Sequence, residues 1–357
     1  MSAIDLSHWK DLLRRTGSID QLGSVREVEY TGGRTEGIKA YEIYTAAGLH
    51  FNVLESRCLD IYNLWYKGIG IPFLSKPGLV AAQYADPQGV NFKRSIAGGM
   101  LYTCGLTNAG NAYVSSDRND HFHGRIRFTP AEHTGSFSET TDGEYRLGVR
   151  GEMRDAGLFM EHLVLKREVS TSLFGKTVSV RDTVENRGFE SQEFMLLYHL
   201  NCGYPMVDKG IDIYIPSAEV MGMNPESEAG IDQWSEITDP VDGFKEHVFV
   251  HTLLCDPNRR VHAGMYNRRL GLGIAYEFDA DILDRIVQWK SMMSGDYVLG
   301  IFPSNNSGAG RGFEEEHGTV KKLEPFEKLE TGVEVTILEG EEDLGHFLRK
   351  FVACKSK

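Results

Sequence analysis

The stretch HLVLKREVSTSLFGKTVSVRDTVEN, residues 162–186, decides the fold class of this chain. Apolar and polar residues alternate through 162–171 and again through 177–185, and Phe174-Gly175-Lys176 lies between the two runs. Apolar residues at every second position are typical of a β-strand with one buried face, and a glycine between two such strands indicates a turn. The stretch therefore predicts an antiparallel hairpin.

The run that follows this hairpin is continuously apolar from Phe194 to Tyr198, which is typical of a strand buried on both faces. His199 and Asn201 come next, just before the Gly203 to Pro205 segment, where the chain must turn. A titratable side chain at the end of a buried strand is costly unless it is hydrogen-bonded or used. His199 is therefore our first candidate functional residue.

Short β-type runs separated by turn residues cover most of the remaining chain, and helical spacing is confined to Asp5 to Arg15 and almost absent after residue 17. This pattern predicts an all-β sandwich or barrel. We expect residues 1–20 to form a helical segment and residues 21–357 a single β domain. The further expected strands are 25–30, 38–45, 50–54, 211–215, 247–254, 261–266, 272–278, 297–302 and 333–338.

The composition is that of a globular protein, with 357 residues of which 41% are hydrophobic and 25% charged. A net charge of −13 argues against nucleic acid or an anionic membrane as the main partner and is compatible with small neutral ligands. No apolar run approaches the length of a membrane span, and no signal peptide is evident. Five scattered cysteines without a CxxC pair favour reduced thiols in a cytoplasmic protein.

Four polar clusters lie at strand ends or beside glycines, namely Arg57 with Asp60, residues 120–125, His199 with Asn201, and a C-terminal group of residues 289–290, 310–311 and 314–316. Arg57 with Asp60 could form a surface ion pair, and the Glu314–Glu316 run is typical of a solvated charged face. On a strand, His121 and His123 would face the same side and could hold a metal, but no third ligand is obvious and we expect none. Residues 123–125 add a glycine that permits close backbone approach and an arginine whose planar guanidinium can bind hydroxyls or carboxylates.

Read in order, these clusters resemble the aldose 1-epimerase, or galactose mutarotase-like, superfamily, and most closely its DUF4432 branch. The resemblance spans about residues 25 to 340. It rests on the stretches 56–61, 98–106, 123–125, 197–205, 289–290, 297–300 and 310–318.

The resemblance implies a large antiparallel β-sandwich, the supersandwich, with a sugar site on the concave face of one sheet. It implies that His199 is the general acid and that His123 binds the sugar. It also implies a small carbohydrate as the partner, with no cofactor, and leaves a homodimer open. The other side chains expected to contact the sugar are Arg57, Arg125, Asp60, Asn201 and Trp289.

The general base is where this chain departs from that branch. The branch has Glu-Pro-x-Asn, but this chain reads Phe302-Pro303-Ser304-Asn305, and a phenylalanine cannot take a proton. Either another carboxylate replaces the base, or the chain is a carbohydrate-binding protein without catalysis; a structural protein with a vestigial pocket is a third reading. The replacement candidates are Asp60, Glu277, Glu314 and Glu316.

Overall fold

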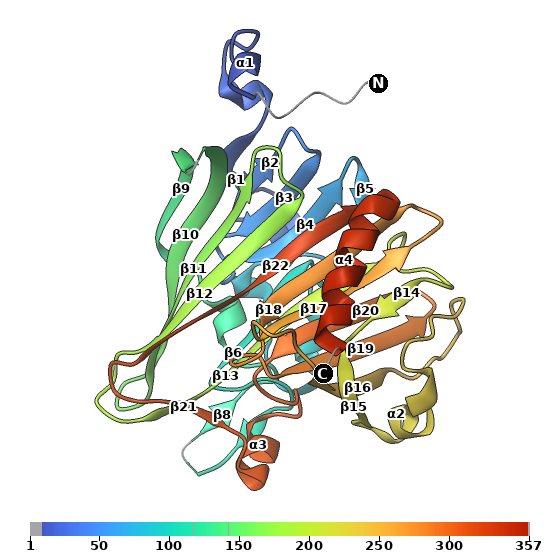
Figure 1. The fold of residues 1–357 in the computed structure, drawn as a ribbon. Coiled ribbons are helices and arrows are strands. Elements are labelled where there is room, and N and C mark those ends of the chain that lie inside the picture. The colour runs from blue at the N-terminus through green and yellow to red at the C-terminus, as the bar shows by residue number, and fades with distance from the viewer. Residues whose placement is uncertain (1–8, 117, 142, 356–357) are drawn as a thin grey trace.

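The computed structural model describes residues 9–116, 118–141 and 143–355 (Figure 1). Its strands form antiparallel sheets of eight, seven and five strands and a small two-stranded sheet, so the expected all-β fold class is confirmed. In the part of the chain described, no helix is both long and apolar enough to cross a membrane.

The eight-stranded sheet contains the predicted hairpin. Val169 of β11 (His162–Ser172) lies opposite Val180 of β12 (Thr177–Asn186), which confirms the pairing on either side of the Gly175 turn. The strand order is β14 (Asp212–Tyr214), β17 (Arg260–Asn267), β18 (Leu272–Asp279), β22 (Lys328–Glu339), β12 (Thr177–Asn186), β11 (His162–Ser172), β10 (Glu144–Ala156) and β9 (Glu132–Thr141).

The seven-stranded sheet is built around β13 (Gln192–Gly203), the strand that carries His199. One edge of β13 pairs with β20, while its other edge pairs with β6 and, near its start, with β21. The remaining order runs outward from β20 through β19 and β16 to β15. The bounds are β6 (Leu101–Leu106), β15 (Ser217–Gly222), β16 (His247–Leu253), β19 (Arg285–Met293), β20 (Asp296–Ser304) and β21 (Lys321–Leu323).

The five-stranded sheet precedes these elements in the chain and follows sequence order, while the two-stranded sheet lies in the segment before His123. The five strands are β1 (Ser24–Tyr30), β2 (Ile38–Tyr44), β3 (Leu49–Leu54), β4 (Asp60–Tyr66) and β5 (Ile69–Gly70), and the two are β7 (Tyr113–Val114) and β8 (Asn119–Asp120).

Both faces of β13 are buried along its apolar part, as predicted. Leu196 and Tyr198 belong to the main core, whereas Met195 and Leu197 pack into a second cluster on the other face of the sheet. The Tyr198 hydroxyl donates to Asp182 of β12 at 2.7 Å, so its face of β13 is turned toward the eight-stranded sheet. Because side chains alternate along a strand, His199 is directed to the opposite face, which we call the far face.

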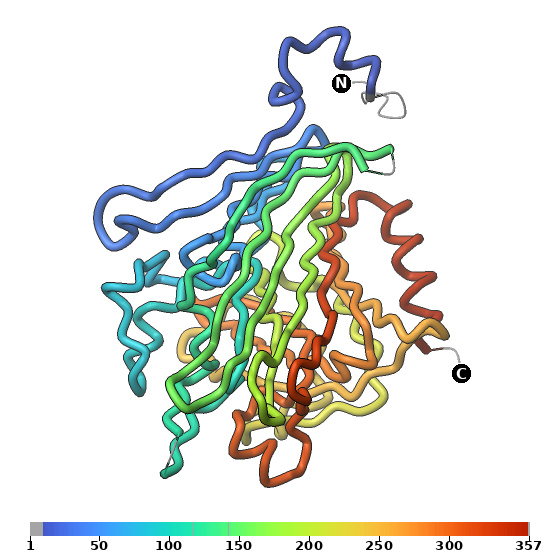
Figure 2. The backbone as a smooth tube through the Cα atoms, turned by 90° about the vertical axis from the view of Figure 1, so that its left-hand side faces the viewer, coloured from blue at the N-terminus to red at the C-terminus, as the bar shows by residue number. Residues whose placement is uncertain are grey.

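The helices correct one expectation. The structure contains α1 (Trp9–Leu12), α2 (Pro225–Ala229), α3 (Arg311–His317) and a 16-residue helix α4 (Gly340–Lys355), although helical spacing was judged almost absent after residue 17. In α4, Leu344, Phe347, Leu348 and Phe351 form one apolar stripe that packs on the eight-stranded sheet. The expected helix at 5–15 lies partly outside the described residues. Figure 2 shows β9–β12 in green crossing the molecule diagonally, with α4 in red to one side.

Candidate functional site

His199 lies between two aromatic side chains that the strand register places on the far face. It is opposite Tyr102 of β6. In the pairing of β13 with β20, Leu197 faces Ser304 and Asn201 faces Gly300, so His199 faces Phe302. The imidazole stacks on the Phe302 ring with centroids 3.6 Å apart and lies 5.8 Å from the Tyr102 ring. The position at which a base was expected is thus a ring that packs against His199.

Two further rings complete what we call the ring cluster, defined as Tyr102, His123, His199, Trp289 and Phe302. The His123 ring is 5.4 Å from the His199 ring, and the Trp289 ring is 5.8 Å from it. Trp289 is only partly buried, as are both histidines. The cluster therefore places aromatic faces beside two imidazoles that are partly exposed.

His123 comes from a turn rather than the strand expected for the His121–His123 pair. His123 and Gly124 both have positive φ, of 62° and 75°. A Cβ on Gly124 would lie 2.1 Å from the Gly105 carbonyl oxygen of β6, so only glycine permits this approach. The turn therefore holds His123 close to β6 and positions its ring over the far face.

The hydrogen bonding of His123 defines its tautomer. Its Nδ1 accepts a hydrogen bond from the Gly110 backbone N–H at 3.0 Å. A neutral imidazole that accepts at Nδ1 carries its proton at Nε2. Burial, with the nearby His199 and Arg127 groups, holds the pKa of His123 well below its ordinary value. His123 is therefore neutral at neutral pH and presents an N–H donor.

His199 is neutral as well in the protein without a ligand. Burial lowers its pKa from 6.5 to about 3, and the nearby Asn201 amide offsets this only in part. Its Nδ1 is buried and has no protein partner among the described residues. Asn201 donates to the carbonyl oxygens of Gly99 and His199, at 3.1 and 3.2 Å. Asn201 thus holds the backbone at the end of β13.

Two arginines lie beside the ring cluster, and sequence reasoning named one of them. Arg57 is buried and packs on the Phe128 ring at 5.0 Å. Arg127, which was missed, is also buried and lies 5.5 Å from the Tyr102 ring. By contrast, Arg125 is exposed and donates to the Asn119 carbonyl oxygen at 2.8 Å. The signal that could have identified Arg127 is the second arginine in the segment that follows His123.

Asp60 is not part of an Arg57 surface ion pair, because it is buried inside the sandwich. It accepts hydrogen bonds from the Thr103 backbone and hydroxyl and lies 3.1 Å from Arg167 Nη1. Thr103 is opposite Tyr198, whose side chain points into the core. Asp60 is therefore on the other side of the sheet from His199, although burial raises its pKa to about 6.

The other three carboxylates named as replacement bases have their own partners or lie in solvent. Glu314 is fully buried rather than solvated, because its carboxylate accepts from the Ser307 N–H at 2.7 Å and closes the turn before α3. Glu316 is exposed on α3. Glu277 is on β18 of the eight-stranded sheet, where a hydrogen bond from His262 lowers its pKa to about 2.

A carboxylate that sequence reasoning missed does contact the ring cluster. The Trp289 indole N–H donates to Glu246 Oε2 at 2.8 Å. Glu246 immediately precedes β16 and lies two and four residues before Val248 and Val250, which pack on the far face. Because side chains alternate along a strand, Glu246 is directed to that face as well. Its side chain is exposed. No sequence motif marked Glu246, since only pairing of β16 with β19 brings it to Trp289.

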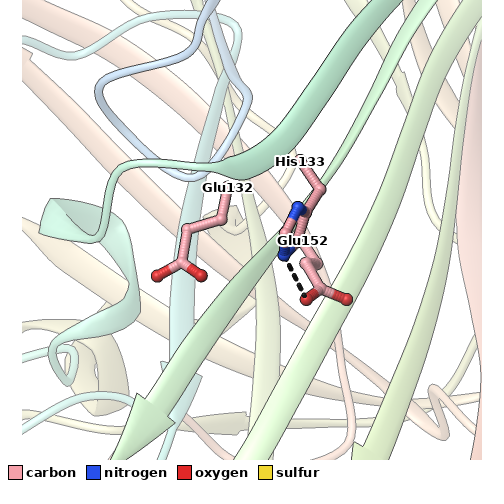
Figure 3. Close-up of side chains that lie close together, drawn as sticks. All are labelled: Glu132, His133 and Glu152. Atoms are coloured by element: carbon pink, nitrogen blue, oxygen red, sulfur yellow. Dashed lines mark ion pairs between the residues drawn. The ribbon is translucent and has the colours of Figure 1, made fainter.

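A separate surface group lies on the outer side of the eight-stranded sheet. Glu132, His133 and Glu152 approach one another there, and Glu152 pairs with His133 at 3.6 Å (Figure 3). Each carboxylate also pairs with an arginine, Glu132 with Arg154 and Glu152 with Arg187. His133 and Glu152 line an open cavity of about 500 Å³ over this sheet, remote in the fold from the ring cluster. We assign it no function.

Comparisons with known proteins give a family and a fold. The family model described as "Domain of unknown function (DUF4432)" matches residues 35–337. A Klebsiella pneumoniae structure put forward as an aldose 1-epimerase has a TM-score of 0.90 at 21% identity, covering 95% of this chain and 91% of that one. The galactose 1-epimerase of Lactobacillus acidophilus has a TM-score of 0.58 at 13% identity, covering 89% and 99%.

A galactose mutarotase-like protein of Clostridium acetobutylicum has a TM-score of 0.60 at 14% identity, covering 89% of this chain and 99% of that one. No curated protein matches the chain. The matches confirm the family resemblance and the fold that the sequence motifs indicated. At these identities the structural likeness shows the fold alone.

Proposed function

The chain belongs to the DUF4432 family and has the fold of the galactose mutarotase-like proteins, and on this basis we propose that it interconverts the anomers of a free sugar or sugar derivative. The observation that carries the proposal is the pair of adjacent imidazoles, arranged edge to face with ring centroids 5.4 Å apart, of which His123 presents an N–H and His199 an Nδ1 without a partner among the described residues. Partly exposed Trp289 offers a flat face for the sugar ring beside them.

Opening a hemiacetal requires removal of a proton from the anomeric hydroxyl and delivery of a proton to the ring oxygen. We propose that His199 delivers the proton and that His123 orients the sugar through its Nε2–H. Since the pKa of His199 is about 3 in the free protein, this role requires the bound sugar to raise it.

For the base we propose Glu246, which replaces the glutamate absent at Phe302. It is held to the ring cluster by the 2.8 Å hydrogen bond from Trp289, and an exposed carboxylate can accept a proton from a bound hydroxyl. The carboxylates proposed from sequence alone lack any contact of this kind among the described residues.

The test is the rate at which a freshly dissolved α-anomer equilibrates, followed by polarimetry over a panel of aldoses. We expect His199→Gln and Glu246→Gln each to reduce the enzymatic rate by roughly 10²–10⁴-fold, the usual contribution of one acid or base. Glu316→Gln removes an exposed carboxylate from α3 and is the matched control. If no sugar equilibrates faster with wild type than with His199→Gln, the proposal is wrong.

A second candidate function is sugar binding without catalysis, and the stacking of Phe302 on His199 favours it. In that case calorimetry finds sugar affinity but polarimetry finds no rate above that of the solution. Phe302→Glu would then gain activity, whereas an active wild type with an inactive Glu246→Gln variant excludes this reading.

We also propose that the protein acts in the cytoplasm on a small carbohydrate. All five cysteines are unpaired, and four of them are buried. Disulfides are rare in reducing compartments, so a chain with five free thiols fits that environment.

A further inference from the structure

Arg57 and Arg127 differ from the other buried arginines of the fold in having no anionic partner. Arg167 is paired with Asp182 at 2.7 Å and with Asp60 at 3.1 Å. Arg311 is paired with Glu193 at 2.6 Å. Within the described residues, neither Arg57 nor Arg127 has a carboxylate within ion-pair distance, although they are only 5% and 1% exposed.

The unpaired donors of the two arginines are the same atoms in each. Nε and Nη2 of Arg57, and Nε and Nη2 of Arg127, are buried without a protein acceptor. Arg127 uses its Nη1 to donate to the Phe122 carbonyl oxygen, so its guanidinium is held in place by one edge. The buried Tyr102 hydroxyl also lacks a partner. Five polar groups that can donate are therefore buried without an acceptor among the described residues.

The two guanidinium groups share one aromatic neighbour. Both pack on the Phe128 ring, with the guanidinium carbons 5.0 Å and 4.7 Å from its centroid. Burial lowers the pKa of Arg57 and the charge of Arg127 adds to this, while Tyr102 and the more distant Asp60 offset it only in part. Two buried like charges without a counter-ion are unfavourable in the free protein, and an anion would relieve both the desolvation and the repulsion.

This arrangement adjoins the proposed sugar site through Tyr102. Its ring is 5.5 Å from the Arg127 guanidinium carbon and 5.8 Å from the His199 ring. An anionic substituent on a sugar ring that lies over the ring cluster would therefore be close to the two arginines.

We propose that the substrate is an anionic sugar, whose carboxylate or phosphate is bound by Arg57, Arg127 and the Tyr102 hydroxyl. A guanidinium offers two parallel N–H groups that match the oxygens of either anion, and a neutral hydroxyl cannot neutralise the pair. The inference rests on the proposed function, because it presumes that the ring cluster binds the sugar.

An anionic substrate would also raise the pKa of His199, which its role as an acid requires. Arg127 is one of the groups that hold the pKa of His199 down in the free protein. An anion seated on Arg127 would cancel that effect and add a negative charge near the imidazole, and both changes favour the protonated form.

The test is calorimetric binding of matched pairs of sugars to the full-length protein at neutral pH. The neutral members are glucose and galactose, and the anionic members are glucuronate, galacturonate and glucose 6-phosphate, which separate the carboxylate from the phosphate. We expect one anionic class to bind about 10- to 100-fold more tightly than its neutral counterpart. Equal affinity within every pair would overturn the inference.

The variants are Arg57→Gln and Arg127→Gln, and Arg150→Gln, which removes an exposed arginine from β10 of the eight-stranded sheet, is the control. We expect the first two to abolish the preference for the anion and the control to retain it. A variant that does not fold is replaced by Arg57→Lys, which keeps the charge but not the fork and should retain part of the preference. Equal loss of affinity for neutral and anionic sugars in these variants would count against the inference.

The activities of the same sugars separate this inference from the proposed function. If neutral sugars are anomerised as fast as the corresponding acids, the inference is wrong and the proposed function stands. Arginine-dependent binding of the anion, without anomerisation and without effect of His199→Gln, means that the anion site is real and the proposed function is wrong.

Discussion

A neutral, partly buried His199 makes the stability of the protein depend on pH in a way that can be measured. The pKa of His199 is about 3 in the folded protein, against an ordinary value of 6.5 in the unfolded chain. Below pH 6.5 the His199 imidazole therefore binds a proton in the unfolded chain but not in the folded protein. The contribution of His199 to stability is fully present above pH 6.5 and is lost as the pH falls toward 3.

The magnitude follows from the two pKa values. At pH 5 the unfolded chain gains roughly 2 kcal/mol from protonating this imidazole, whereas the folded protein gains almost nothing. The variant His199→Phe removes the titratable group and keeps an aromatic ring against Phe302. Relative to wild type, it should therefore become more stable by at most about 2 kcal/mol between pH 7.5 and pH 5.

The assay is urea denaturation of both proteins at the two pH values, with His346→Gln as the control. His346 is exposed on α4, so its replacement should shift stability equally at both pH values. If the difference between wild type and His199→Phe does not change with pH, His199 titrates normally. The argument that a bound anion must raise its pKa would then fail.

Two further predictions concern the elements that position the site. Asp182→Ala should destabilise the protein by about 3–5 kcal/mol in urea denaturation, because the buried Arg167 charge then loses one of its carboxylate partners. The control Asp281→Ala breaks only an exposed ion pair and should cost less than about 1 kcal/mol. Gly124→Ala should abolish sugar binding through its clash with β6, while Gly210→Ala, with a similar φ of 76° but open space, should retain it. Equal calorimetric titrations for the two glycine variants would contradict this reading.

Much of the fold could be predicted because its signals are local. Alternation on either side of Gly175 predicted the β11–β12 hairpin, and the apolar run to Tyr198 predicted a strand buried on both faces. Helix α4 was missed although its Leu344, Phe347 and Phe351 spacing is helical, since strand signals dominate the surrounding chain.

The candidate site was predictable only where a motif carried it. His199 and His123 were named from the sequence, and the structure places their rings 5.4 Å apart. Asp60 was named beside Arg57 because the two are close in the chain, but strand alternation directs Asp60 into the core toward Arg167.

The sequence by itself determined the all-β class, the family and the two histidines, because strand periodicity and short motifs are properties of neighbouring residues. Only the tertiary structure decided which charges remain without partners. Arg167 and Arg57 look alike in the sequence, yet one meets Asp182 across a strand pair and the other meets no described carboxylate. Ion pairing depends on contacts between residues distant in the chain, and those contacts exist only once the sheets have packed.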